Sequence, residues 1–138
     1  MWSQFFSDDA CNKGLSDNEI IKFQKASYSK LGFFIPFQYA ELLKTVNGYK
    51  NNEKMIYAAD NDIIPSENTD EIEGYIVRNT YIRANHYRNG LLYIGETPKV
   101  YYAYNYLQNQ FVSVDRKTLD VVKVYFCFND ILSEITNK

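Results

Sequence analysis

Hydrophobic residues recur at helical spacing in the first third of the chain, between two clear boundary signals. Ser16 can cap the free amides at the start of a helix, and Glu19, three positions later, can reach back to the amide of Ser16. Gly32 readily adopts the left-handed conformation that ends many helices. We therefore predict an amphipathic helix between Ser16 and Gly32, with a buried face formed by Ile20, Phe23, Ala26, Ser27 and Leu31.

A second helical pattern follows a short apolar link at residues 33–35. Pro36 suits the first turn of a helix, where its missing amide hydrogen costs nothing and its fixed φ is already helical. Asn47 and Gly48 can take positive φ values, so we expect the chain to turn there and continue as a strand. The apolar stripe of this second helix is expected to be Tyr39, Leu42, Leu43 and Val46.

The hydrophobic period changes to that of β-strands from Leu91 onward. One face of the expected sheet should pack on the helices, whereas the other is rich in tyrosine and is either solvated, covered by the central segment or presented to a partner. Asn129 can cap a closing helix whose apolar stripe is Ile131, Leu132 and Ile135. The alternation predicts an antiparallel meander of four strands at residues 91–95, 100–105, 111–115 and 121–126.

The central segment is polar apart from an apolar island at residues 55–59, which we interpret as a strand. An acidic run follows this island, and no lysine or arginine occurs between Lys54 and Arg78. This is the sharpest charge asymmetry in the chain. The carboxylates of the run are Asp60, Asp62, Glu67, Asp70, Glu71 and Glu73.

The end of the acidic run carries the start signal of a third helix. Asp70 can act as its cap, with Glu73 three positions later. Asn79 lies on the face of this predicted helix that is expected to be buried, so its side chain must find hydrogen-bond partners. We expect Asn79 to order the adjoining loop. The expected buried face is Ile72, Tyr75, Ile76, Asn79 and Ile82.

The segment IPFQYAELLKTVNG resembles the central motif of the SUKH superfamily, the Smi/Knr-like domains. The YIGE segment at residues 93–96, the tyrosine-rich strands and the closing FNDILSEI segment follow in the order of that family. The resemblance implies an α+β fold in a single domain over residues 1–138. That fold has two N-terminal helices, a mixed and largely antiparallel sheet ending in a meander, a central helix and a C-terminal helix. The residues that match the motif are Ile35, Pro36, Tyr39, Leu42, Leu43, Asn47 and Gly48.

The resemblance also implies a function based on binding. Most bacterial members of the superfamily are immunity proteins that bind and neutralise a polymorphic toxin, often a nuclease. Eukaryotic relatives act as regulatory scaffolds in cell-wall signalling. A regulatory or scaffold protein of the Smi/Knr type without a toxin partner is therefore the alternative.

Composition limits the partners that this chain can attract. A formal net charge of −2 and a pI of about 5.4 provide no basic field for nucleic acid or an anionic membrane, so we expect neither to be bound directly. No segment approaches the roughly 20 apolar residues that cross a bilayer, and we expect a cytoplasmic protein. Cys11 and Cys127 lie far apart without a CxxC pair, which favours two independent reduced thiols.

The sequence contains no constellation typical of catalysis. His86 is the single histidine and has no cysteine near it in sequence. A small hydrolase that uses His86 is therefore the third and least favoured hypothesis. The segment starting at Asp60 resembles a calcium loop, but Ile64 occupies the fifth ligand position and Pro65 the position of the essential glycine. We therefore predict no enzyme activity, no metal site and no cofactor.

The candidate partner-binding residues combine the acidic run with the tyrosine-rich sheet. A nuclease must carry positive charge to engage phosphates, so an acidic surface can steer its approach while tyrosines dock in the final complex. A solvated loop with a dipole-favoured helix start is the structural alternative for the acids. The candidates are Asp60, Asp62, Glu67, Asp70, Glu71, Glu73 and Tyr101.

Overall fold

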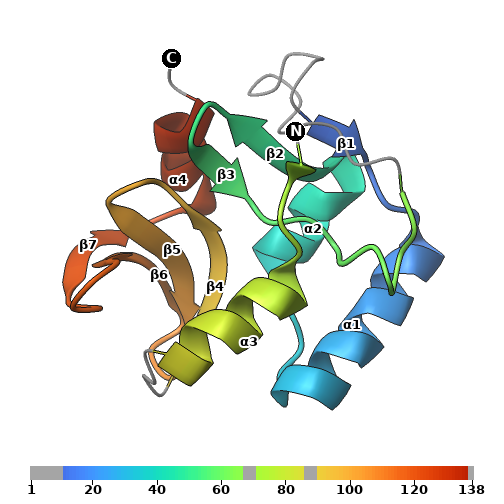
Figure 1. The fold of residues 1–138 in the computed structure, drawn as a ribbon, viewed down its shortest axis with the longest axis horizontal. Coiled ribbons are helices and arrows are strands. Elements are labelled where there is room, and N and C mark those ends of the chain that lie inside the picture. Colours follow the sequence, from blue (N-terminus) through green and yellow to red (C-terminus); the bar gives the residue numbers. More distant parts are fainter. Residues whose placement is uncertain (1–10, 67–70, 86–89, 137–138) are drawn as a thin grey trace.

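The computed structural model describes residues 11–66, 71–85 and 90–136, and an antiparallel β-sheet forms its framework. Each strand pairs with the strand next to it in the sequence, so the order across the sheet is the order along the chain (Figure 1). The seven strands of the described residues are β1 (Cys11–Lys13), β2 (Val46–Asn51), β3 (Lys54–Ile56), β4 (Leu91–Glu96), β5 (Val100–Asn105), β6 (Gln110–Asp115) and β7 (Val121–Tyr125).

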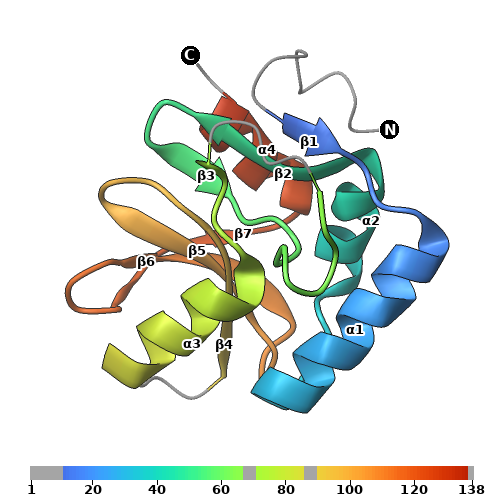
Figure 2. The ribbon, with the colours of Figure 1, turned by 45° about the vertical axis from the view of Figure 1, so that its right-hand side comes forward.

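Four helices accompany this sheet within the described ranges. They are α1 (Asp17–Leu31) and α2 (Phe37–Thr45) between β1 and β2, α3 (Tyr75–Asn85) between β3 and β4, and α4 (Phe128–Thr136) after β7. In Figures 1 and 2, α3 lies in front of the sheet and α4 behind it. The α+β class and the largely antiparallel sheet are confirmed.

The start and end of α1 lie where the local signals predicted them. The hydroxyl of Ser16 accepts a hydrogen bond from the amide of Glu19 at 3.2 Å, and the carboxylate of Glu19 accepts one from the amide of Ser16 at 2.9 Å. Gly32 closes the helix with a φ of 85°. These contacts involve residues within a few positions of one another, which is why the sequence pattern was sufficient.

The link from α2 to β2 is tighter than the sequence indicated. Pro36 immediately precedes α2, and β2 begins directly after Thr45. Val46 is therefore buried as the first residue of a strand and not as part of the predicted helix stripe. Gly48 has the expected positive φ, at 88°, but it lies inside β2. A Cβ atom at this position would lie 2.8 Å from side-chain atoms of Ala58 and Ile72, so the close packing at this point also requires a glycine.

Several expected boundaries were wrong. The apolar island forms β3 only as far as Ile56, and beyond it Ala58 makes an isolated parallel bridge with Gly74. Strand β1 was not anticipated, because three residues are too few to show a period. Helix α4 begins at Phe128, so Asn129 lies in its first turn and not before it.

The predicted start of the third helix was also wrong. Helix α3 begins at Tyr75, and Glu71 and Glu73 precede it, while Asp70 lies outside the described residues. The buried face is correct for the helical residues, because Tyr75, Ile76, Asn79 and Ile82 are all buried. The cap comes instead from a more distant carboxylate, that of Asp60.

Buried Asn79 has the hydrogen bonds that its burial demanded, but they hold a strand and not a loop. Its amide nitrogen donates to the carbonyl of Tyr93 at 2.8 Å, and its side-chain oxygen accepts from the amide of Tyr93 at 2.7 Å. Strand β3 pairs with β4 only at Gly95 and Glu96, so Asn79 bonds the stretch of β4 that β3 leaves uncovered. The side chain of Asn79 thus bonds α3 to both the amide and the carbonyl of one residue of β4.

The tyrosine-rich face of the meander is covered by α4. The hydroxyls of Tyr102 and Tyr125 each donate to the carboxylate of Glu134 at 2.9 Å, and the rings of Phe111 and Phe128 lie 5.0 Å apart. Six of the twelve tyrosines in the described residues have fully buried side chains, so the abundance of tyrosine does not by itself mark an interface. These six are Tyr39, Tyr49, Tyr57, Tyr75, Tyr93 and Tyr102.

The acid sensitivity of the fold is expected to depend on Glu134. Burial raises the pKa of this carboxyl, but hydrogen bonds from Lys123, Tyr102 and Tyr125 outweigh burial and hold the pKa below its usual value. A carboxyl with a pKa lowered by folding stabilises the fold above its unfolded-state pKa, and this contribution disappears as the pH falls through the folded-state pKa. Glu134→Gln should therefore be less stable than the parent near pH 7, with a difference that shrinks below about pH 4. Urea denaturation at the two pH values measures this, and a pH-independent difference would contradict it.

Candidate functional site

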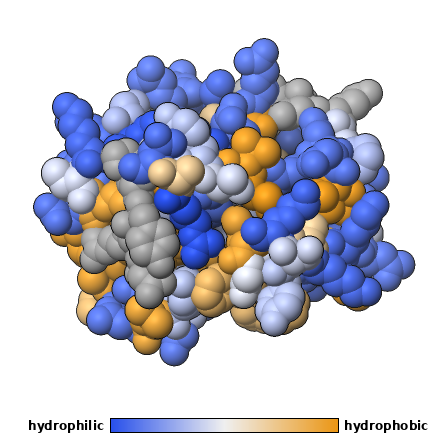
Figure 3. Space-filling view, turned by 60° about the horizontal axis from the view of Figure 1, so that its bottom comes forward, coloured by the Kyte–Doolittle hydropathy of each residue, from blue (hydrophilic) through white to orange (hydrophobic). Residues whose placement is uncertain are grey.

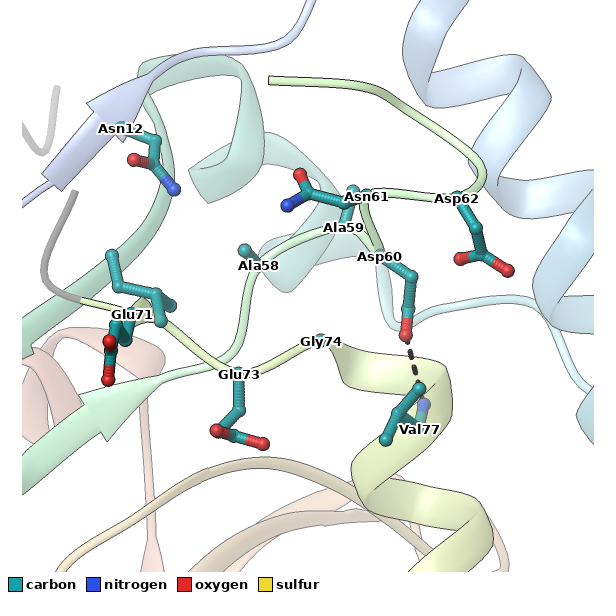
Figure 4. Close-up of a pocket in the computed structure, with 11 residues that line it drawn as sticks. Asn12, Ala58, Ala59, Asp60, Asn61, Asp62, Glu71, Glu73, Gly74 and Val77 are labelled. Atoms are coloured by element: carbon teal, nitrogen blue, oxygen red, sulfur yellow. Dashed lines mark hydrogen bonds between the residues drawn. The ribbon is translucent and has the colours of Figure 1, made fainter. Parts of the chain in front are cut away.

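The acidic run borders an open cavity of about 520 Å³ beside the start of α3. One wall is the segment that follows β3, and the other is the segment that leads into α3 (Figure 4). Asn12 of β1 lies at a third side of the cavity. The residues of the two main walls are Ala58, Ala59, Asp60, Asn61 and Asp62 on one side and Glu71, Ile72, Glu73, Gly74 and Val77 on the other.

Backbone hydrogen bonds hold the two walls together. The amide of Ala58 donates to the carbonyl of Glu73 at 2.9 Å, and the amide of Tyr75 donates to the carbonyl of Ala58 at 2.8 Å. The amide of Ala59 donates to the side-chain oxygen of buried Asn47 at 2.8 Å. The cavity is therefore framed by backbone that is fixed to both β2 and α3, although neither wall is itself a long regular element.

Asp60 anchors this frame. Its side chain is buried, and its two carboxylate oxygens accept hydrogen bonds from the amides of Ile76 at 2.8 Å and Val77 at 3.0 Å. These are free amides in the first turn of α3, so Asp60 supplies the cap that the sequence had assigned to Asp70. Burial raises the pKa of Asp60, and the two amide hydrogen bonds partly oppose that shift.

The exposed carboxylates of the cavity are Asp62, Glu71 and Glu73. Glu71 and Glu73 extend in the same direction from one wall, while Asp62 stands on the opposite wall beyond Asp60 (Figure 4). Within the described residues, no group of three or more histidine, cysteine, aspartate or glutamate side chains lies close enough to hold a metal ion. The spread of the carboxylates suits an extended cationic surface better than a single small cation.

The other candidate residues have different positions. Glu67 and Asp70 lie outside the described residues, as does His86. Tyr101 is only 4% exposed, and its ring lies 5.5 Å from that of Tyr93 and 4.7 Å from the guanidinium carbon of Arg116. Asp60 and Tyr101 therefore have structural roles. Among the residues that the structure describes, the exposed part of the predicted acidic surface consists of Asp62, Glu71 and Glu73.

Exposed hydrophobic surface is divided into separate patches on the face shown in Figure 3, where orange areas alternate with blue ones. One patch adjoins the acidic cavity. Val77 and Tyr81, one turn apart on α3, are 59% and 54% exposed. They border a groove of about 360 Å³ that is lined by Lys30, Asp60, Asp62, Ile63, Ile76, Val77, Thr80 and Tyr81.

The predictions from the sequence did not include this groove. Val77 and Tyr81 lie on a side of the third helix that is outside the predicted apolar face. An apolar pair four positions apart on that side was the available signal, but such pairs are also common on ordinary helix surfaces. The neighbouring loop residue Ile63 could not have been placed beside them without coordinates.

A second charged cluster lies between α3 and the sheet. The carboxylate of Glu96 is 3.0 Å from the guanidinium of Arg78 and 3.1 Å from that of Arg116, and it accepts a hydrogen bond from the hydroxyl of Tyr57 at 2.7 Å. The side chains of Glu96, Arg78 and Arg116 are 14%, 16% and 30% exposed. Both carboxylate oxygens of Glu96 already have protein partners, so we assign a structural role to this cluster.

In comparisons with known proteins, no protein-family model and no curated protein matches this chain. Within the described ranges, none of the helices combines the length and the apolar character needed to cross a bilayer.

Proposed function

We propose that this protein is an immunity protein of the SUKH type, which binds a toxin domain and blocks it without breaking or forming covalent bonds. The observation that carries the proposal is the set of exposed carboxylates, Asp62, Glu71 and Glu73, around one open cavity on a rigid frame. The motif residues support it. Tyr39, Leu42 and Leu43 form the buried face of α2, as the resemblance implies.

The mechanism follows from the chemistry of nucleases. A nuclease must present cationic side chains to hold the phosphates of its substrate. An acidic surface on the immunity protein attracts those side chains, which accelerates encounter and then competes with the nucleic acid for the same groups. Inhibition in this scheme requires only that the immunity protein occupy the toxin surface, and it needs no cofactor.

The proposal predicts a salt-dependent loss of binding on charge reversal. The triple variant Asp62→Lys, Glu71→Lys, Glu73→Lys should bind its toxin at least tenfold more weakly at low salt, with a smaller difference at high salt, because screening weakens exposed charge pairs. The measurement is affinity for a toxin domain encoded in the same genome, combined with survival of cells that express both proteins.

A matched control variant distinguishes the effect of the cavity charges on binding from the effect of the net charge of the protein. The exposed acids Glu53, Asp120 and Asp130 do not line the cavity, and their reversal changes the net charge by the same amount. The control variant should retain binding and protection. If both triple variants bind equally well, the acidic cavity is not the toxin surface. If no toxin of the genome is neutralised by the parent protein, the immunity function itself is wrong, and the regulatory scaffold becomes the better proposal.

A further inference from the structure

The acidic cavity and the apolar groove are adjoining parts of one surface. Both are lined by Asp60, Asp62 and Val77, which form their shared border. The acidic end carries Glu71 and Glu73, and the apolar end carries the exposed side chain of Tyr81. A ligand that lies along the surface therefore meets carboxylates first and apolar side chains next.

The apolar end is preorganised. The guanidinium carbon of Arg78 lies 5.2 Å from the centre of the Tyr81 ring, which limits the motion of that ring. Ile76 is buried beneath the groove, and Ile63 packs against the hydrophobic core from the other wall. A fixed aromatic side chain loses little conformational entropy when a partner binds to it, which makes such residues effective docking sites.

The charge of the surface specifies the occupant. The described residues that line the cavity and the groove include three exposed carboxylates, Asp62, Glu71 and Glu73, and one ammonium group, that of Lys30 at the border of the groove. The combined surface is therefore anionic, and it favours a cationic ligand over an anionic or neutral one. The apolar groove beside it favours a ligand that also carries an apolar side chain, which a purely electrostatic surface would not select.

We propose that this surface docks a partner segment in which an arginine or lysine lies next to a large apolar side chain. The cationic group lies beside Asp62, which lines both the cavity and the groove, in the wider negative field of Glu71 and Glu73, and the apolar side chain fills the groove against Val77 and Tyr81. The inference rests on the proposed function in one respect, since it describes the element that a toxin presents. The recognition chemistry itself can be tested without a toxin.

The test uses capped hexapeptides titrated into the isotope-labelled full chain and followed by amide chemical shifts. The probe is Gly-Ser-Arg-Leu-Ser-Gly, and the controls replace either its arginine or its leucine with serine. We expect the probe to bind with a Kd of about 1 mM and each control to bind at least fivefold more weakly. The shifted amides should lie at residues 60–64 and 76–81. No shift in these amides at about 5 mM probe, or equal binding of all three peptides, would overturn the inference.

Variants of the protein supply the second arm. Val77→Ser with Tyr81→Ser should weaken probe binding at least fivefold, whereas Ile21→Ser with Tyr28→Ser on α1 should not change it. The control pair is matched, because Ile21 and Tyr28 are 53% and 56% exposed. Equal effects of the two pairs would show nonspecific apolar binding and would contradict the assignment.

The outcome for the groove can be separated from the outcome for immunity. If the variant with Val77→Ser and Tyr81→Ser no longer binds the probe but still protects cells from a toxin, the groove is not the toxin surface and the immunity proposal stands. If the parent binds the probe but protects against no toxin, the docking surface stands and the immunity proposal fails. Loss of both probe binding and protection in the same variant supports both.

Discussion

Replacing Asn79 with alanine is expected to lower the free energy of unfolding by about 2–4 kcal/mol, because two buried backbone groups lose their partners together. Asn79 is fully buried, and it bonds both the amide and the carbonyl of Tyr93. Each lost bond to a buried group costs on the order of 1–3 kcal/mol. No neighbouring strand can replace them, since β3 pairs with β4 only at Gly95 and Glu96.

Chemical denaturation of the purified protein measures this effect, and the same helix offers a matched control. Asn85 donates to the carbonyl of Tyr81 at 2.8 Å, the same local bond that Asn79 makes to Tyr75, but it is exposed. Asn85→Ala should therefore change the stability by less than about 0.5 kcal/mol. Similar losses for the two variants would show that the bonds to β4 contribute little.

Replacing Glu96 with glutamine is expected to cost about 2–3 kcal/mol. The change removes the negative charge between Arg78 and Arg116 and leaves two guanidinium groups close together. Breaking a buried ion pair typically costs 3–5 kcal/mol, and the partial exposure of these side chains, 14–30%, reduces that figure.

The control for Glu96 is an ion pair of ordinary surface type. Glu41 lies 2.8 Å from Lys44, and their side chains are 30% and 39% exposed. Glu41→Gln should cost less than about 1 kcal/mol. Combining Glu96→Gln with Arg78→Met should cost less than the sum of the two single changes, because the second removes a charge that the first has left without compensation. Strict additivity in denaturation experiments would contradict the proposed coupling.

The sequence predicted the elements whose signals are local. The boundaries of α1 depend on Ser16, Glu19 and Gly32, all of which act within one turn of the helix end. Helix α3 shows the opposite case. Its cap, Asp60, is separated from Ile76 by a loop, and no spacing rule links residues so far apart. Asp70 and Glu73 fit the local rule, and the tertiary contact overrode it.

The sequence predicted part of the candidate site. The acidic run does border a cavity, but the roles of its members depend on burial, which charge spacing does not report. Asp60 supports a helix, whereas Asp62, Glu71 and Glu73 are exposed. Tyr101 was expected at a surface and is buried, because the chain covers both faces of the central strands. The groove at Val77 and Tyr81 requires the packing of a loop against a helix, and alternation along the sequence does not encode it.

The strand order of the sheet has a consequence for how the chain acquires its structure. Since every strand lies beside its predecessor, the sheet can grow by adding one hairpin arm at a time, and no segment has to insert between two that are already joined. Strands β4 to β7 are linked by short turns, so their contacts close small loops and incur little entropy loss. We therefore expect this half of the molecule to form early in folding, so that the remaining elements assemble on it.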